Sequence, residues 1–442
     1  VNVAVTAQIP DLSVLSPLAG RPLPAIKTVA FQDSLTDADG GFRHGAALHS
    51  VTLTSADGDL SGDASIGLAA RPSLSADLKS SRFDLDALQA AIDQVPDAAT
   101  STPAPNTAPP PRPAKRRGEA LFSNQPIPVA LLRSADADVK LDIADLHTGG
   151  TDYKAIDAHA VLSNGKLTVD PFAGNVPGGH LSGTLTVDAA QSSPPVHVVL
   201  HAPGLALKPI LAATHQPAYA TGNLEIYADL SGTGDTPHAI AASLSGSLGL
   251  AMAGGTLDNR LMGNLLGKVM DSLNVLNLVG KGGSSDLRCF GMRMDAQRGI
   301  GTIKALALSS SLLTMSGAGA ANLGSETLAM TLRPQARIAG TGLVIPLTVT
   351  GPIRDPVVKM NDLHTAEANA GTVAGAVIGG ATGLGIVGGL LGADKLLGGG
   401  STDVCPAALA AARGQAAPEA APAKAGKPSV SNPGALLKSL FR

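Results

Sequence analysis

The chain has 442 residues, a formal net charge of −3, no tryptophan and only 2% aromatic residues. This composition excludes a nucleic-acid-binding surface, because such a surface needs a basic field and aromatic stacking platforms. The length exceeds that of one compact core, so we expect several domains or one elongated repeat. The 52 glycines and 31 prolines are typical of many short strands joined by turns.

The first stretch, residues 1–96, alternates apolar and polar residues as strands do. The alternation predicts strands around Ala46–Ser55, Gly62–Leu68 and Ser73–Lys79. The run Asp84–Gln94 predicts a short helix instead, because its apolar residues recur at helical spacing and Asp84 is a suitable N-cap.

The composition of residues 97–119 predicts a linker, and this linker is the clearest domain boundary in the chain. Proline is frequent there and no apolar periodicity is present, so we expect an extended and solvated segment. The basic cluster Lys115–Arg117 is compatible with two interpretations: contact with anionic lipid head groups, or an ordinary solvated linker. The boundary separates an upstream β-rich segment, residues 1–96, from a second β domain, residues 120–360.

Strands of the second domain carry one apolar and one polar face. In Gly222–Gly232, aliphatic residues alternate with asparagine, glutamate, tyrosine and aspartate, and side chains of a strand alternate between its two faces. The same period of two recurs along the chain and predicts a long antiparallel sheet with one apolar face. We place these residues on that face: Val139, Leu141, Ile143, Leu167, Val169, Leu185, Val187, Leu224, Ile226, Leu230, Leu328, Met330 and Leu332.

The sequence also repeats itself. Gly58–Gly62 is echoed by Gly179–Gly183, and each phrase is followed by a strand, a proline and a helix-like run. Such repetition is typical of arrays that stack similar units. The predicted fold is therefore mostly β: an elongated, antiparallel, repeat-like curved sheet with a few short helices. Exposed apolar surface costs about 25 cal/mol per Å², so the apolar face is either an open groove that acyl chains fill or the inside of packed sandwiches.

Two later stretches depart from the strand pattern. Apolar residues at helical spacing in residues 257–280 predict a helix that either caps the sheet or contacts a membrane. The last part, residues 361–442, is a Gly-rich apolar segment followed by a low-complexity tail, with a short helix expected at Ala407–Arg413.

Glycines recur at every fourth residue of an uncharged run in this last part, a spacing that allows close helix approach. They are Gly371, Gly375, Gly379 and Gly383. The run is either a helix or hairpin that contacts a membrane or closes the end of the groove, or a flexible linker. A dinucleotide-binding fingerprint within the run is rejected, because no βαβ unit surrounds it.

No arrangement of residues indicates catalysis. The ten histidines are scattered, no serine elbow is present, and no pair of carboxylates stands out from the solvated strand faces. We therefore expect no enzymatic activity, no cofactor and no metal site.

Short phrases in order along the chain resemble the AsmA family of bacterial envelope proteins. They include Leu121-Phe122-Ser123, Leu167-Thr168-Val169-Asp170-Pro171, Ser316-Gly317-Ala318-Gly319 and Pro346–Pro352. Upstream, Asp59–Gly62 and Arg71-Pro72 fit the same family. The resemblance implies a long periplasmic β-structure, an inner-membrane anchor and a role in outer-membrane biogenesis, with lipid carried along a hydrophobic groove. Because the first residue is Val1, we expect the chain to be the C-terminal part of a longer protein whose N-terminal anchoring helix is absent here.

The two cysteines, Cys289 and Cys405, are compatible with one disulfide or with two buried thiols. The periplasmic location that the resemblance implies favours a disulfide that ties the C-terminal segment back to the last sheet.

Two functions follow from the two ways of covering the apolar face. In the first, the chain carries or bridges phospholipid between the inner membrane and the outer membrane along the groove, without nucleic acid as a partner. In the second, it is a structural or regulatory periplasmic protein with packed sandwiches that affects outer-membrane protein assembly. A polysaccharide-binding protein is a weaker third hypothesis, because aromatic residues for sugar stacking are scarce.

Overall fold

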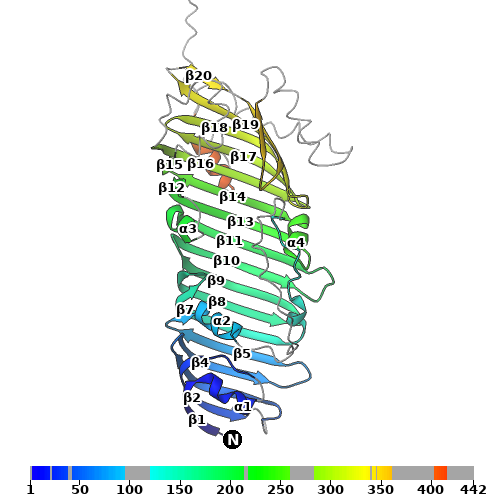
Figure 1. Ribbon diagram of the computed structural model, residues 1–442. Helices are drawn as coiled ribbons and strands as arrows, with labels where there is room; N and C mark the ends of the chain where they lie inside the picture. Colours follow the sequence, from blue (N-terminus) through cyan, green and yellow to red (C-terminus); the bar gives the residue numbers. More distant parts are fainter. Residues whose placement is uncertain are drawn as a thin grey trace, which may run out of the picture.

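The computed structural model describes residues 2–19, 22–37, 42–94, 120–213, 218–258, 283–338, 341–344, 346–360 and 403–415. Their strands form one continuous sheet, which rises as a ladder from β1 at the N-terminal end to β20 at the other end (Figure 1). The predicted fold class, an elongated and mostly β structure with a few short helices, is confirmed.

The strands before the predicted linker are β1 (Asn2–Asp11), β2 (Lys27–Asp37), β3 (Gly45–Ser55), β4 (Gly58–Gly67), β5 (Ser73–Ser80) and β6 (Phe83–Asp84). The middle strands are β7 (Asp136–Thr148), β8 (Thr151–Ser163), β9 (Lys166–Val176), β10 (Gly179–Asp188), β11 (Pro195–Ala206), β12 (Ala220–Thr221), β13 (Asn223–Thr233), β14 (Ser245–Ala253) and β15 (Thr256–Asp258). The last strands are β16 (Ser284–Gln297), β17 (Ile300–Ser310), β18 (Leu313–Asn322), β19 (Thr327–Ile338), β20 (Thr341–Val344), β21 (Leu347–Pro352) and β22 (Val357–Met360).

The described helices are short. They are α1 (Ser16–Ala19), α2 (Leu85–Asp93), α3 (Leu207–Ala213), α4 (Pro237–Ser243) and α8 (Cys405–Ala412), with 3-10 turns at Leu12–Leu15 and Val129–Arg133. The Asp84 side chain accepts a hydrogen bond from the Ala87 N–H and caps α2, as the sequence indicates. No helix in the described part of the chain is long and apolar enough to cross a membrane.

The pairings of β5 and β6 with β7 depart from the predicted antiparallel pattern. β5 and β6 both pair with β7 in parallel, whereas the other pairings are antiparallel. A parallel pair needs a crossover connection, because the chain must return to the end of the sheet from which the first strand started. The predicted linker, residues 97–119, belongs to that crossover and lies outside the described residues. The sheet itself runs on from β5 to β7.

One helix prediction is wrong at its start. Leu257, the first residue of the predicted helix over residues 257–280, lies in β15 and pairs with Ser285 of β16. Its side chain is 5% exposed, so sheet pairing and burial override the helical spacing there. Residues 259–282 lie outside the described part. At the other end of the chain, α8 confirms the short helix expected at Ala407–Arg413.

Candidate functional site: an apolar trough

The strand register aligns apolar residues across the whole sheet. One line of direct partners from β1 to β21 contains only aliphatic residues and glycines. It runs Val3, Leu35, Leu48, Ala64, Ala76, Val139, Ala160, Val169, Leu185, Val198, Leu230, Gly246, Ala296, Gly301, Ala321, Leu328 and Gly351. Since direct partners share a sheet face, this line defines one apolar face, which we call the inner face.

All the residues that the sequence places on the apolar face lie on the inner face. Val139, Val169, Leu185, Leu230 and Leu328 belong to the line itself. The others stand two, four or six residues away on the same strands, as a period of two requires: Leu141, Ile143, Leu167, Val187, Leu224, Ile226, Met330 and Leu332. The structure therefore brings the whole set together on one surface. Their role in holding lipid stays a prediction.

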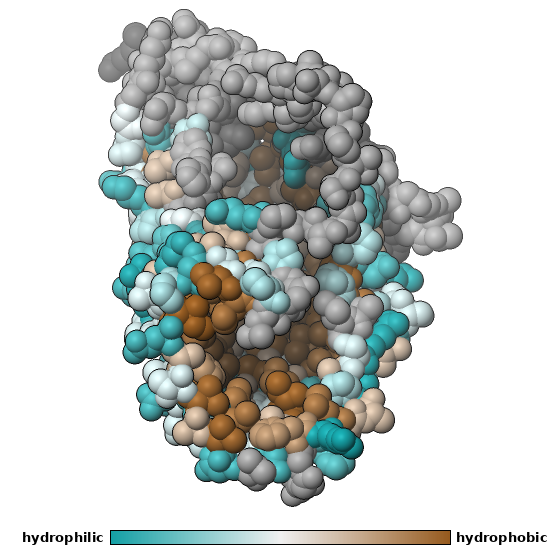
Figure 2. Space-filling view, turned by 60° about the horizontal axis from the view of Figure 1, so that its bottom comes forward, coloured by the Kyte–Doolittle hydropathy of each residue, from teal (hydrophilic) through white to brown (hydrophobic). Residues whose placement is uncertain are grey.

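The inner face is shielded but lacks a packed second layer among the described residues. All the predicted residues are half-buried except Ile143, which is 6% exposed. Side chains inside a sandwich core are more completely buried than this. Figure 2 shows the corresponding hollow, which is lined by hydrophobic residues and opens at the N-terminal end of the ladder. We call this hollow the trough.

Buried polar side chains interrupt the trough near its N-terminal end. Asp33 of β2 pairs with Val5 of β1 on the inner face and is 4% exposed. Neither of its carboxylate oxygens has a hydrogen-bond partner. Burial of an unpaired polar group is costly. Ser80 is a second such group: it pairs with Ile143 on the inner face, is 5% exposed, and its hydroxyl has no hydrogen-bond partner.

The outer face of the sheet is polar and solvated. Histidines form cross-strand pairs with carboxylates there: His159 Nε2 lies 2.7 Å from an Asp138 oxygen and His197 Nε2 lies 2.8 Å from an Asp229 oxygen. Among the described residues, no group of three or more metal-ligating side chains lies close enough together to hold a metal ion. The prediction that the protein is not an enzyme has no direct test in the structure.

Helix α8 covers one patch of the outer face, over β14, β16 and β17. Small residues of these strands form the surface on which the helix packs, and we call this surface the cradle. A Cβ atom on Gly249 would lie 1.7 Å from the Ala412 carbonyl oxygen, and one on Gly291 would lie 2.7 Å from the Ala408 carbonyl. Only glycine fits at these two positions, so the helix and the sheet are matched in shape.

Burial on β17 reflects the helix that packs on its outer face. Ala305 and Ala307 face α8 and are 7% and 4% exposed, whereas the larger Leu306 and Leu308 between them face the trough and are only half-buried. In an ordinary sandwich, the large residues would be the buried ones. Other large inner-face residues at this end are buried: Ile303 of β17 is 7% exposed, Val349 9% and Leu347 0%.

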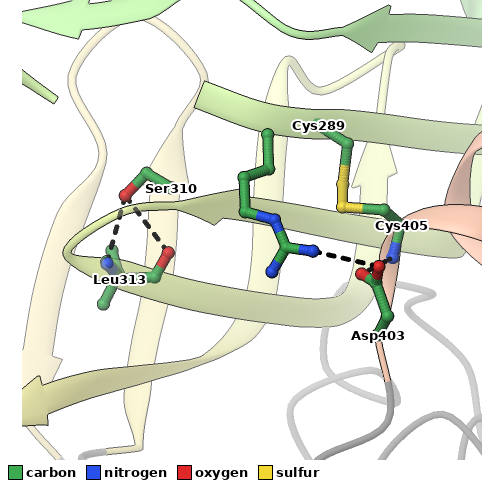
Figure 3. Close-up of a disulfide and its surroundings, with 6 residues drawn as sticks. Cys289, Ser310, Leu313, Asp403 and Cys405 are labelled. Carbon is green, nitrogen blue, oxygen red and sulfur yellow. Dashed lines mark hydrogen bonds and ion pairs between the residues drawn. A yellow bond between two sulfur atoms is a disulfide. The ribbon is translucent and has the colours of Figure 1, made fainter. Parts of the chain in front are cut away.

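The predicted disulfide is present. Cys289 of β16 and Cys405 of α8 are bonded, with Cα atoms 5.7 Å apart and a separation of 116 residues along the sequence (Figure 3). It therefore ties α8 to the outer face of the sheet. Beside it, Asp403 accepts a hydrogen bond from the Cys405 N–H at 3.1 Å and pairs with Arg288 at 3.1 Å.

An ion pair holds the other end of α8. The Arg413 guanidinium binds both carboxylate oxygens of Glu225, at 2.6 and 2.7 Å. These hydrogen bonds lower the pKa of the Glu225 carboxyl below its ordinary value, despite partial burial. The Glu225 charge therefore stabilises the docked helix above the ordinary glutamate pKa, and this contribution is lost as the pH falls through the lowered pKa.

A strap, residues 120–135, which includes the 3-10 turn Val129–Arg133, follows one rim of the trough. It begins at the β18–β19 turn, where the Glu326 carboxylate accepts hydrogen bonds from the Leu121 and Phe122 N–H groups. These two donors lower the pKa of the Glu326 carboxyl. The strap then exchanges backbone hydrogen bonds with the start of α4: Ile127 N–H donates to Asp235 and His238 N–H donates to Ser123.

Arginines fasten the far end of the strap. Arg133 donates to the carbonyls of Ala189 and Gln191 in the β10–β11 turn. Arg71, after β4, donates to the carbonyls of Arg133 and Ala135, each at 2.9 Å, and to Asp136 at 2.7 Å. We call the whole row of strand ends on this side of the sheet the strap rim. α3 lies at the opposite rim from α4 (Figure 1).

Sequence reasoning missed the cradle and the strap. The cradle has a detectable signal, because Gly249, Gly291, Ala305 and Ala307 stand where the alternation would place polar residues. The strap has none, since Leu121 and Glu326 are 205 residues apart. The predicted membrane or groove-end residues Gly371, Gly375, Gly379 and Gly383 lie outside the described residues.

The fold and the trough define a class of protein: a long one-sided β-sheet whose apolar face is hollowed and whose polar face is solvated. The chain belongs to the AsmA family, whose sequence profile matches residues 47–306, more than half of its length. The resemblance drawn from the sequence is thereby confirmed, and it associates the chain with the bacterial envelope.

A similar curated protein is the AsmA family protein YhjG of Escherichia coli (strain K12). It is 24% identical over 227 residues, which is 50% of this chain and 32% of that protein. The match thus spans only about a third of its relative. No solved structure matches the chain.

Proposed function

We propose that the chain is a non-enzymatic lipid conduit of the bacterial envelope, which carries or bridges phospholipid between the inner membrane and the outer membrane along the trough. The observation that carries this proposal is the unbroken line of apolar partners from Val3 to Gly351. Aliphatic side chains provide no directional hydrogen bonds, so an acyl chain can slide along them. The phospholipid head group stays at the wet rim.

The size of the trough supports transport. Neighbouring strands are about 4.8 Å apart, so the line of partners is roughly 75 Å long. One leaflet of a bilayer's hydrocarbon core is about 15 Å thick, so several acyl chains fit along the line. Each Å² of apolar surface that lipid covers contributes about 25 cal/mol.

The disulfide supports a periplasmic location, because such bonds persist in oxidising compartments. We propose that an upstream helix anchors the protein in the inner membrane and that the trough leads toward the outer membrane. The rival function, a structural protein with packed sandwiches, fits less well because the predicted groove residues other than Ile143 are only half-buried.

Mass spectrometry of lipids that remain with the purified chain tests the proposal. We expect phospholipids to be retained through detergent-free purification and to be exchanged for added phospholipid. A trough that is empty after such purification, and that takes up no phospholipid from vesicles, would contradict the conduit and favour the structural protein.

A further inference from the structure

The strap does not run along the whole strap rim. Its last contacts are those of Arg71 with the backbone of Arg133 and Ala135. Beyond Arg71 toward the N-terminal end, the described part of the same rim consists of residues 42–44 and the ends of β4 and β5.

Large apolar side chains are exposed at this part of the rim. Phe42 is 42% exposed, Ile66 45%, Leu68 54% and Leu74 39%. Ile66 and Leu74 are direct partners in β4 and β5. The Leu68 N–H donates to the His44 carbonyl at 2.8 Å, which places Leu68 beside the turn that carries Phe42.

This patch is continuous with the trough. Ile66 pairs with Ala46 of β3, and Leu74 pairs with Ala137 of β7. Both therefore lie on the inner face, two residues from Ala64 and Ala76 of the apolar line. An acyl chain that leaves the inner face here would stay on apolar surface up to the rim.

A cation stands beside the patch. Arg43 is exposed in the same turn as Phe42, and no carboxylate in the described part of the chain pairs with it. Arg71, by contrast, is held by Asp136 and two carbonyls. Of the carboxylates nearby, Asp63 lies on the outer face, 3.7 Å from His49, whereas Asp37 pairs with Ala46 and lies on the inner face. A phosphate at the rim would have the exposed Arg43 guanidinium as its cationic partner.

We propose that this part of the strap rim, formed by Phe42, Arg43, Ile66, Leu68 and Leu74, is a lateral port through which phospholipid enters and leaves the trough. The acyl chains cross over the apolar residues, and the phosphate is received by the Arg43 guanidinium. This inference rests on the proposed function, because a port has a role only if the trough holds lipid.

Loading kinetics test the port. The chain is mixed with donor vesicles of phosphatidylethanolamine and phosphatidylglycerol that contain a fluorescent phospholipid, and the initial rate and the final amount of lipid bound are measured. We expect Arg43→Glu to slow the loading of phospholipid about fivefold, since loss and reversal of one exposed charge weaken a charge-assisted contact. Final occupancy should not change, because the inner face is intact.

A lipid without a phosphate distinguishes the role of Arg43 from that of the apolar residues of the port. Loading of fluorescent diacylglycerol, which has no phosphate, should be unaffected by Arg43→Glu. The double variant Phe42→Ser with Leu68→Ser should slow the loading of both lipids, because it removes exposed apolar surface at the rim. Arg298→Glu is the matched control: it lies in the β16–β17 turn of the same rim, and its side chain is also exposed.

The outcomes distinguish the port from the conduit. If wild-type protein loads lipid and the port variants load it as fast as the control, lipid enters elsewhere and the port is wrong. If Arg43→Glu slows diacylglycerol as much as phospholipid, recognition of the phosphate is wrong. If the wild-type chain takes up neither lipid, the conduit itself fails. Circular dichroism of each variant shows that the fold is retained.

Discussion

Ile226→Asp should reduce the transfer of phospholipid along the trough at least about tenfold. Ile226 lies midway along the sheet and pairs with Ala202 and Leu250 on the inner face. A carboxylate that contacts an acyl chain loses hydration without gaining a hydrogen-bond partner. Each 1.4 kcal/mol of this cost lowers the equilibrium constant for lipid occupancy about tenfold. Transfer between donor and acceptor vesicles and the number of lipids bound per chain measure the effect.

The variant should remain folded, because Ile226 is half-buried and a carboxylate in an empty trough can stay hydrated. Ser231→Asp, an exposed outer-face position on the same strand, is the matched control and should transfer lipid normally. Global unfolding of Ile226→Asp beside a folded control would mean that the inner face is a packed core. That outcome would favour the structural protein.

Replacing both Cys289 and Cys405 with serine should lower the free energy of unfolding by about 5 kcal/mol. The disulfide closes a loop across 116 residues, and the chain-entropy relation assigns this value to a loop of that size. α8 should then leave its cradle, because its remaining fastenings are the Arg413–Glu225 and Arg288–Asp403 ion pairs. Urea denaturation and hydrogen exchange on α8 measure the two effects.

Arg288→Gln is the control for this loss. It breaks only the neighbouring ion pair with Asp403, whose side chains are 48% and 47% exposed, and such pairs contribute at most about 1 kcal/mol. If the double serine variant unfolds at the same urea concentration as the wild type and α8 stays protected, the shape of the Gly249 and Gly291 cradle holds the helix without the disulfide.

The alternation of apolar and polar residues predicted the inner face, because paired strands place their apolar side chains on the same side of the sheet. Alternation fixes the face of each strand, and hairpin register then aligns one strand's face with the next, as Leu185, Val198 and Leu230 show. The capped helix α2 was predictable for a similar reason, since its N-cap Asp84 and its apolar spacing are local.

Other features depend on contacts that no local pattern contains. The parallel pairing of β5 with β7 depends on a crossover, and the strap is held by Glu326, far along the chain. Leu257 begins a run with helical spacing, but it pairs with Ser285 of β16 as part of the sheet. The disulfide was predicted, yet only the structure shows that it fastens α8 to the outer face and leaves the trough free.

Two neighbouring valines of β11 provide the most direct test of the trough. Val198 pairs with Leu185 and Leu230 on the inner face, whereas Val199 pairs with Thr184 and Asp229 on the outer face. The two side chains are of one type and are both half-buried, so they differ chiefly in the face they occupy. A photoreactive amino acid placed at each position and irradiated in intact cells should form phospholipid adducts at Val198 and none at Val199. Equal adducts at both positions, or none at Val198, would contradict a lipid-filled trough.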